Sequence, residues 1–168
     1  MATALARHRY DLVVDAGIAG ALGGSAAIGE GVIVVDDRLE LSLEDGRSLS
    51  LPPGSAVVDR ATSTAALVSA IQAHGFATLR GVTVCRVTST ETTAERLIGA
   101  GTQIETMEGF AVLRACARAA VPVVQLRGIS NRVGDRDRSG WNFPAGLDGL
   151  ARIATVLFDH IAAEDTAT

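Results

Sequence analysis

Two short, almost wholly apolar runs separated by a glycine-rich stretch constrain the fold of this chain more than any other feature. Residues 10–15 (YDLVVD) and 31–36 (GVIVVD) flank residues 16–24 (AGIAGALGG). Apolar runs without polar alternation are typical of strands that are buried on both faces. We therefore expect two central strands, a glycine-rich turn over 16–24, and helices that cover both faces of the sheet.

The rest of the chain continues this alternation of strands and helices. Residues 79–87 (LRGVTVCRV) and 123–127 predict two further strands, and residues 37–53 predict a polar hairpin or loop. Apolar spacing of three and four residues predicts helices over 61–74, 92–99, 108–120 and 147–163. Residues 2–8 are expected to be the end of a further helix. The 168 residues fit one domain, 1–168, of the α/β class with a largely parallel sheet.

Composition narrows the function classes. A net charge of -4 and a sequence pI near 5.3 provide no basic footprint for nucleic acid, and 4% aromatic residues provide few stacking platforms. No apolar stretch reaches the roughly 18–20 residues that a membrane helix requires. No CxxC or Cys/His cluster predicts a metal, and no cofactor is expected. We expect a cytoplasmic protein whose partner is a small molecule.

Three polar or glycine-rich stretches follow predicted strands, where α/β proteins bind ligands. They are residues 15–20, 88–90 and 130–131. The glycines of the first stretch would let a ligand approach the backbone, although a tight strand-to-helix turn explains them equally simply. Asn131 offers both an acceptor and a donor to the edge of a heterocycle, and it is also a common turn residue.

Two other stretches carry charged side chains. In residues 105–108 (ETME) a carboxylate stands at a predicted helix start, where it either caps the helix or accepts hydrogen bonds from a vicinal diol such as ribose. In the second reading Met107 packs on the sugar. The loop 132–141 (RVGDRDRSGW) holds three arginines and the only tryptophan. Its alternating arginines and aspartates indicate either ion pairs on the protein surface or a binding site. In the binding site an arginine would pair with a ligand carboxylate beside the tryptophan ring.

These stretches together resemble one family. The run VVDAGIAGALGGSAAIGEGVIVVD is similar to the first strands and glycine turn of the purine nucleoside phosphorylase/nucleosidase superfamily. The run TMEGFAVLRACARAAVPVVQLRGISN resembles its Met-Glu helix and its terminal Ile-Ser-Asp/Asn motif, and SNRVGDRDRSGW resembles the futalosine hydrolase branch. The resemblance implies a three-layer αβα sandwich with a mixed sheet. It also implies hydrolysis of the N-ribosidic bond of futalosine, which releases hypoxanthine and dehypoxanthine futalosine in menaquinone biosynthesis.

The resemblance also implies roles for single residues. Glu108 would accept from the ribose 2′- and 3′-hydroxyls, and Asn131 would face purine N7, where an amide suits a 6-oxopurine such as hypoxanthine. Trp141 would lie over the 5′ substituent, and Arg136 or Arg138 would pair with the benzoate carboxylate of futalosine. The expected catalytic residues are Asn131 and Glu108, and the expected substrate-binding residues are Ile18, Ala19, Gly20, Ser89, Thr90, Thr106, Met107, Glu108, Asn131, Arg136, Arg138 and Trp141.

Two departures from the family pattern bear on activity. Ile18 stands where the family carries a hydroxyl-bearing residue that helps to hold phosphate, which favours hydrolysis over phosphorolysis. The opening strands of the family, with a glutamate that orients the attacking water, have no counterpart before Tyr10, so the resemblance implies an N-terminally truncated fold. The alternatives are therefore a 5′-methylthioadenosine/S-adenosylhomocysteine nucleosidase, a purine nucleoside phosphorylase, or a catalytically silent nucleoside-binding protein. The resemblance also implies self-association, as a homodimer or a higher homo-oligomer.

Overall fold

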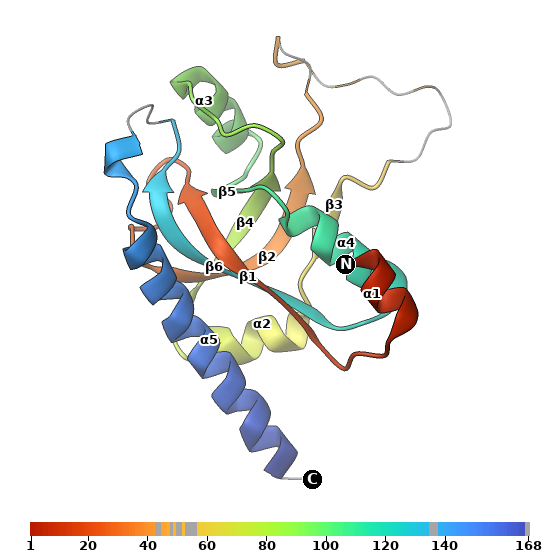
Figure 1. Ribbon diagram of the computed structural model, residues 1–168. Coiled ribbons are helices and arrows are strands. Elements are labelled where there is room, and N and C mark those ends of the chain that lie inside the picture. The colour runs from red at the N-terminus through yellow and green to blue at the C-terminus, as the bar shows by residue number, and fades with distance from the viewer. Residues whose placement is uncertain (43–44, 48, 50–51, 53–56, 135–137, 167–168) are drawn as a thin grey trace.

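The computed structural model describes residues 1–42, 45–47, 49, 52, 57–134 and 138–166 (Figure 1). Along these residues three consecutive strands are followed by strands that alternate with helices. In chain order the elements are α1 (Ala2–Arg7), β1 (Val13–Ala21), β2 (Gly31–Leu39), β3 (Arg60–Thr62), α2 (Ala65–Gln72), β4 (Ala77–Thr83), α3 (Glu91–Gly99), β5 (Ile104–Thr106), α4 (Gly109–Ala119), β6 (Val123–Arg132), a 3-10 turn (Arg138–Gly140) and α5 (Phe143–Thr166). The predicted α/β class is confirmed.

The strands form one mixed sheet in the order β3-β2-β4-β5-β1-β6, and a further pairing joins β2 to β6. This last pairing closes five strands into a ring, with β3 attached to the second half of β2. Among the described residues, the pairs β2–β4, β4–β5 and β1–β6 are parallel, whereas β1–β5, β2–β3 and β2–β6 are antiparallel. The sheet is therefore mixed, as expected, with fewer parallel pairs than expected.

The glycine-rich turn predicted over 16–24 is wrong for most of its length. Strand β1 continues to Ala21, and the turn begins only at Gly23 and Gly24, whose φ angles are positive. The earlier glycines make room for side chains of β6 instead. A Cβ on Gly17 would lie 3.1 Å from Arg127 Nη1. Glycine within a strand commonly marks such a close approach, which a sequence pattern cannot distinguish from a turn.

Other boundaries differ for reasons of pairing. The segment predicted as one helix over 61–74 begins as strand β3, which pairs with β2, and only then forms α2. Strand β5 was not predicted, because three residues show no periodicity; it exists because it pairs with β4 on one side and β1 on the other. Strand β6 extends to Arg132, so Ser130 and Asn131, which were expected to follow a strand ending at Arg127, lie within it.

Helices cover the sheet on more than one side (Figure 1). Helices α2 and α5 pack over β2 and β6 through a cluster that includes Ile33, Ile71, Leu126 and Leu157. Helix α4 packs through Phe110 and Leu113, and α3 through a separate cluster around Leu97. Burial of these aliphatic side chains supplies the main favourable free energy of folding.

Helix α5 approaches the sheet unusually closely near the end of β6. A Cβ on Gly128 would lie 2.7 Å from the carbonyl carbon of Gly146, so both elements need glycine there. Asn142 precedes the helix; its N–H donates to the Ser130 carbonyl (2.8 Å) and its Oδ1 accepts from the Ala145 N–H (3.0 Å). The start of α5 is thus fixed against the carboxyl end of β6.

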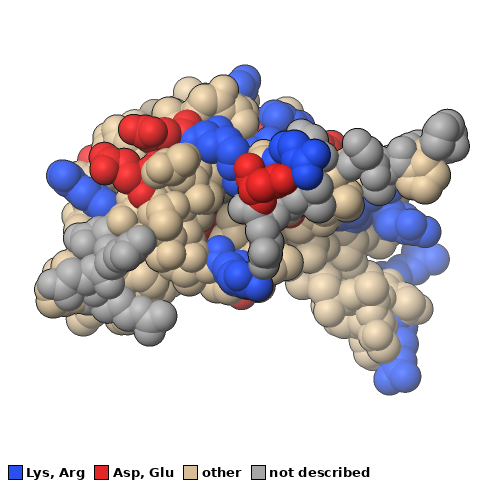
Figure 2. All heavy atoms as spheres, turned by 90° about the horizontal axis from the view of Figure 1, so that it is seen from above, with Lys and Arg blue, Asp and Glu red and all other residues tan. Residues whose placement is uncertain are grey.

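Arginines and acidic residues are interspersed on the face drawn in Figure 2. Several of the exposed charges form ion pairs, such as Arg60 with Asp36 (2.8 Å). Within the described part of the chain, none of the helices combines the length and apolar character needed to cross a bilayer.

Candidate functional site

A cavity of about 210 Å³ lies where β1, β5, β6 and the start of α4 meet. It gathers segments that are more than 100 residues apart in the sequence. Its lining residues are Ile18, Ala19, Gly20, Val87, Glu105, Thr106, Met107, Glu108, Asn131 and Trp141. Eight of these were expected as substrate-binding residues, so the structure brings together the stretches 15–20, 105–108 and 130–131 with Trp141 of the arginine-rich loop.

The floor of the cavity is set by the pairing of Gly20 with Asn131 across β1 and β6. A Cβ on Gly20 would lie 3.0 Å from Asn131 Nδ2, so glycine leaves space for the amide. Asn131 Oδ1 accepts from the Ser130 hydroxyl (2.8 Å), and one Nδ2 N–H donates to the Arg132 carbonyl (3.1 Å). These two bonds hold the amide in one orientation and leave its second N–H for a ligand.

Glu108 occupies the N-cap position of α4, yet its side chain makes no capping hydrogen bond. The helix amide that a cap would satisfy is taken by another group, because the Phe110 N–H donates to Thr83 Oγ1 (2.8 Å). The capping interpretation of Glu108 is therefore wrong in this structure. Its exposed carboxylate, and the neighbouring Met107, which is 48% exposed, remain at the mouth of the cavity.

A buried polar network centred on Asp37 contacts the first turn of α4. Asp37 is fully buried and accepts from Thr83 Oγ1 (2.8 Å), Thr106 Oγ1 (2.9 Å) and Gln125 Nε2 (3.1 Å). Burial raises the pKa of Asp37, and the hydrogen bonds from Gln125, Thr106 and Thr83 partly oppose that rise. Because Thr83 also holds the Phe110 amide, the network links β2, β4, β5 and β6 to the first turn of α4.

Trp141 forms one side of the cavity. It directly precedes Asn142, which is anchored to the end of β6, and it stacks edge-on against Phe143 with ring centroids 5.6 Å apart. The arginine-rich loop resembled a ligand-binding segment from its sequence. Of its two expected carboxylate ligands, Arg136 lies outside the described residues, and for Arg138 only its place in the 3-10 turn is described.

Two cavity residues received no role from sequence reasoning. Val87 precedes the expected stretch 88–90, and Glu105 stands within the ETME segment. Glu105 is 7% exposed, and its Oε1 accepts from the Thr88 N–H (3.0 Å). Burial raises the pKa of Glu105, and interactions with the Thr88 side chain and with its backbone N–H oppose this. Glu105 can be recognised as a candidate site residue only when the strand that buries it, β5, is known.

Ser89 and Thr90 do not line the cavity. Thr90 is the N-cap of α3, where its hydroxyl oxygen accepts from the Thr93 N–H (3.3 Å). The stretch after β4 therefore reaches the cavity through Val87, and through the backbone of Thr88 by way of Glu105.

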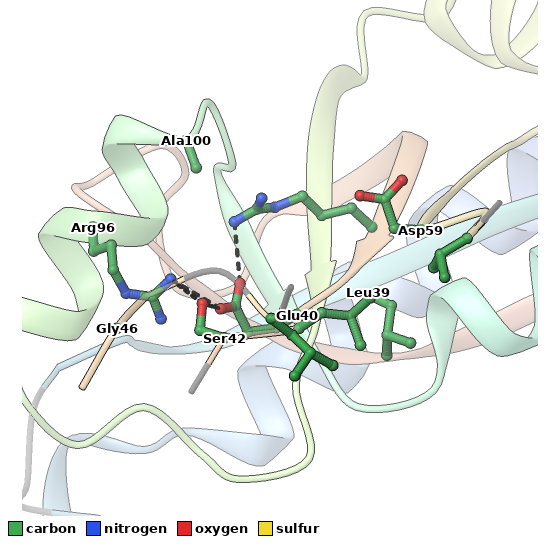
Figure 3. A pocket seen from close by; sticks show the side chains of 11 residues that line it. Leu39, Glu40, Ser42, Gly46, Asp59, Arg96 and Ala100 are labelled. Carbon is green, nitrogen blue, oxygen red and sulfur yellow. Dashed lines mark hydrogen bonds and ion pairs between the residues drawn. The ribbon is translucent and has the colours of Figure 1, made fainter. Parts of the chain in front are cut away.

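A larger hollow of about 510 Å³ lies beside the end of β2 (Figure 3). There Arg96 and Ser42 point toward Glu40, and the Arg96 guanidinium lies 2.9 Å from Glu40 Oε1 (Figure 3). Burial alone would raise the pKa of Glu40, but the hydrogen bonds from Ser42 and Arg96, with the charges of Arg96 and Arg38, hold it below its usual value. The Glu40 carboxylate is thus already paired with Arg38, Ser42 and Arg96, so the smaller cavity, which holds the unpaired Glu108 carboxylate, is the better candidate site.

No group of three or more His, Cys, Asp or Glu side chains that could hold a metal ion occurs among residues 1–42, 45–47, 49, 52, 57–134 and 138–166. The polar groups of the cavity are backbone and side-chain amides and two carboxylates, from three strands and one helix start. Such a set suits a small polar organic molecule with an apolar ring, which would lie between the β1 backbone and the side chains of Met107 and Trp141.

Comparison with known proteins agrees with this geometry. The family model described as "Phosphorylase superfamily" matches residues 1–162. The futalosine hydrolase of Streptomyces coelicolor is 35% identical over 165 residues, which cover 92% of this chain and 69% of that protein. The futalosine hydrolase of Acidothermus cellulolyticus is 37% identical over 161 residues, which cover 87% of this chain and 64% of that protein.

Among solved structures, a 5′-methylthioadenosine/S-adenosylhomocysteine nucleosidase from Helicobacter pylori, determined with butyl-thio-DADMe-Immucillin-A, superposes with a TM-score of 0.77 at 16% identity. The match covers 89% of this chain and 68% of that one. The likeness shows that the two chains share a fold.

Proposed function

Because the chain belongs to the phosphorylase superfamily, we propose that it is a nucleosidase that hydrolyses the N-ribosidic bond of futalosine and releases hypoxanthine. The sequence similarity to two futalosine hydrolases supports the choice of substrate. The activity would place the protein in menaquinone biosynthesis, and its small-molecule partner would be a purine nucleoside. The cytoplasmic location and the homodimer expected from the sequence remain predictions.

The observation that carries the proposal is the free carboxylate of Glu108 facing the same cavity as the oriented amide of Asn131. Cleavage of an N-ribosidic bond develops positive charge on the ribose and negative charge on the departing base. A carboxylate that accepts from the ribose 2′- and 3′-hydroxyls stabilises the first charge. An N–H donor at purine N7 or O6 stabilises the second.

Asn131 would act by hydrogen bonding and not as an acid, since an amide cannot deliver a proton. Its orientation is already fixed by Ser130 and Arg132, so little reorganisation is needed when the base departs. Met107 would pack on the sugar, and Trp141 would lie over the 5′ substituent. Residues 18–20 would contact the nucleoside, since all three line the cavity.

The test is to incubate the full chain with futalosine, inosine, 5′-methylthioadenosine or S-adenosylhomocysteine, each with and without phosphate. The free base that is released is measured by chromatography. We expect phosphate-independent release of hypoxanthine from futalosine. Glu108→Gln should lower kcat/KM by about 100- to 1000-fold, as loss of one charge-stabilising group typically does. The matched change Glu95→Gln, on the exposed face of α3, should leave it unchanged.

Other outcomes identify the alternatives. Phosphate-dependent release would indicate a phosphorylase, and release of adenine in preference to hypoxanthine would indicate the methylthioadenosine-type activity. Binding of hypoxanthine without any product would indicate a silent nucleoside-binding protein. For the 5′ end, Arg136→Ala and Arg138→Ala should raise the KM for futalosine but not for inosine, which lacks the benzoate.

A further inference from the structure

Glu108 lies between two positions that are held by the same buried carboxylate. Thr106, which precedes it by two residues, donates from its hydroxyl to Asp37 Oδ2 (2.9 Å). Phe110, which follows it by two residues, donates its N–H to Thr83 Oγ1 (2.8 Å), and that hydroxyl donates in turn to Asp37 Oδ1 (2.8 Å). The two oxygens of one carboxylate therefore hold the chain on both sides of Glu108.

Glu108 itself is held through its backbone alone. Its carbonyl accepts from the N–H groups of Ala111 (3.0 Å) and Val112 (3.2 Å), which begins α4. Its carboxylate makes no capping hydrogen bond, is exposed, and lines the cavity. The backbone of this residue is thus fixed, whereas its side chain stays available to a ligand.

The group that holds the helix start is closed to solvent and tightly packed. Its members are all at most 4% exposed: Asp37, Thr83, Thr106 and Gln125. A Cβ on Gly109 would overlap both Asp37 Oδ2 and Gln125 Nε2, so glycine lets α4 begin in direct contact with these side chains. Buried hydrogen bonds to a charged group are costly to leave unmade, which favours a single arrangement of the group.

We propose that Asp37 and Thr83 are positioning residues for catalysis: they hold the first turn of α4 so that the Glu108 carboxylate meets the ribose hydroxyls. This inference rests on the proposed function, since it assumes that Glu108 accepts from those hydroxyls. Neither Asp37 nor Thr83 is among the residues that line the described cavity, so both act through Glu108. A displacement of about 1 Å in a reacting or charge-stabilising group can cost roughly 100-fold in rate.

The experiment compares two substrates, which separates positioning from a general loss of stability. Futalosine and 2′-deoxyfutalosine differ only in the 2′-hydroxyl, which donates to Glu108 under the proposal. The ratio of their kcat/KM values does not depend on the fraction of a variant that is folded. Thr83→Val keeps the shape of the side chain but leaves the Phe110 N–H without its acceptor, and should lower this ratio at least about tenfold. Thr83→Ser, which restores the hydroxyl, should keep the wild-type ratio.

Thr102→Val is the matched control. Thr102 is also a buried threonine, but its hydroxyl donates to the Leu97 carbonyl (2.7 Å) and does not contact Asp37. The control should lower the stability of the chain and leave the substrate ratio unchanged. Asp37→Ala removes the acceptor of both Thr83 and Thr106, so it should lower the ratio in the same direction as Thr83→Val.

A double-mutant cycle shows whether the effect passes through Glu108. Once Glu108→Ala has removed the carboxylate, Thr83→Val should lower the ratio no further. An unchanged ratio in Thr83→Val, or the same loss in the presence and absence of Glu108, overturns the positioning role and leaves the nucleosidase proposal standing. A wild-type chain that releases no base from futalosine overturns both.

Discussion

The substitution Gly109→Ala tests the buried network beneath the candidate site. Gly109 is the first residue of α4, and an ideal Cβ there would overlap both Asp37 Oδ2 and Gln125 Nε2 and lie 2.8 Å from Gln125 Cδ. Real Cβ contacts are not that close, so one of the two polar partners must move. The methyl group would separate Gln125 Nε2 from the carboxylate that it now contacts at 3.1 Å.

The magnitude follows from two terms. Loss of a buried hydrogen bond to a charged group costs about 1.5–3 kcal/mol. Inserting a methyl into a packed site costs about 1–3 kcal/mol through strain. We expect Gly109→Ala to reduce the free energy of unfolding by about 3–5 kcal/mol, which for a chain of this length lowers the Tm by roughly 10–15 °C.

The assay is urea denaturation followed by circular dichroism, with thermal melts in parallel. The control is Gly99→Ala at the end of α3, where a Cβ would meet nothing within 4 Å. Alanine is the better helix former there, so the control should be neutral or more stable by up to about 1 kcal/mol. Combining Gly109→Ala with Gln125→Ala should cost less than the two single changes together, since the smaller side chain removes one overlap.

One result would refute the reasoning. If Gly109→Ala unfolds within about 1 kcal/mol of wild type while Gly99→Ala behaves as expected, α4 does not begin in contact with Asp37 and Gln125. That result would mean that the buried network does not hold the Phe110 N–H, and it would leave the absence of a capping hydrogen bond from Glu108 unexplained.

Two further predictions concern buried charge. Burial raises the folded-state pKa of Glu105 and of Asp37. Each carboxyl therefore contributes its full stability below the ordinary carboxyl pKa of about 4, where it is protonated in both states. That contribution is lost as the pH rises through the raised folded-state pKa. The Tm of Glu105→Gln relative to wild type should therefore increase from pH 4 to pH 8 in melts, and a constant difference would contradict this. Arg127 and Asp15 form an ion pair of 2.7 Å whose side chains are 3% and 11% exposed. Arg127→Ala should cost about 3–5 kcal/mol in urea denaturation because it strands the aspartate, whereas Arg127→Met with Asp15→Leu should be nearly neutral; equal losses would contradict the prediction.

Local pattern was sufficient for much of the site. The amphipathic spacing after Glu108 correctly predicts a helix starting there, and the buried run from Val123 correctly predicts a strand, which extends past Arg127 to include Asn131. Both residues line the cavity. These features depend on neighbours in the sequence, which is why the sequence reveals them.

The parts that were missed depend on distant partners. The glycines at 17 and 20 looked like a turn because the side chains that they accommodate, Arg127 and Asn131, lie about 110 residues further along the chain. Strand β5 is too short to show a period, so Glu105 had no face assigned to it. Its burial follows only from the pairing of β5 with β1.

Closure of the sheet through β2 and β6 has a consequence for self-assembly. Within the described residues, β2 and β6 have strand neighbours on both sides over 32–34 and 125–128, so the backbone there offers no template to another chain. The terminal strand β3 has three residues, one of them Arg60. Short and charged edges resist strand addition. A chain nearly half apolar by composition thus keeps the apolar centres of β2 and β6 away from cross-β association.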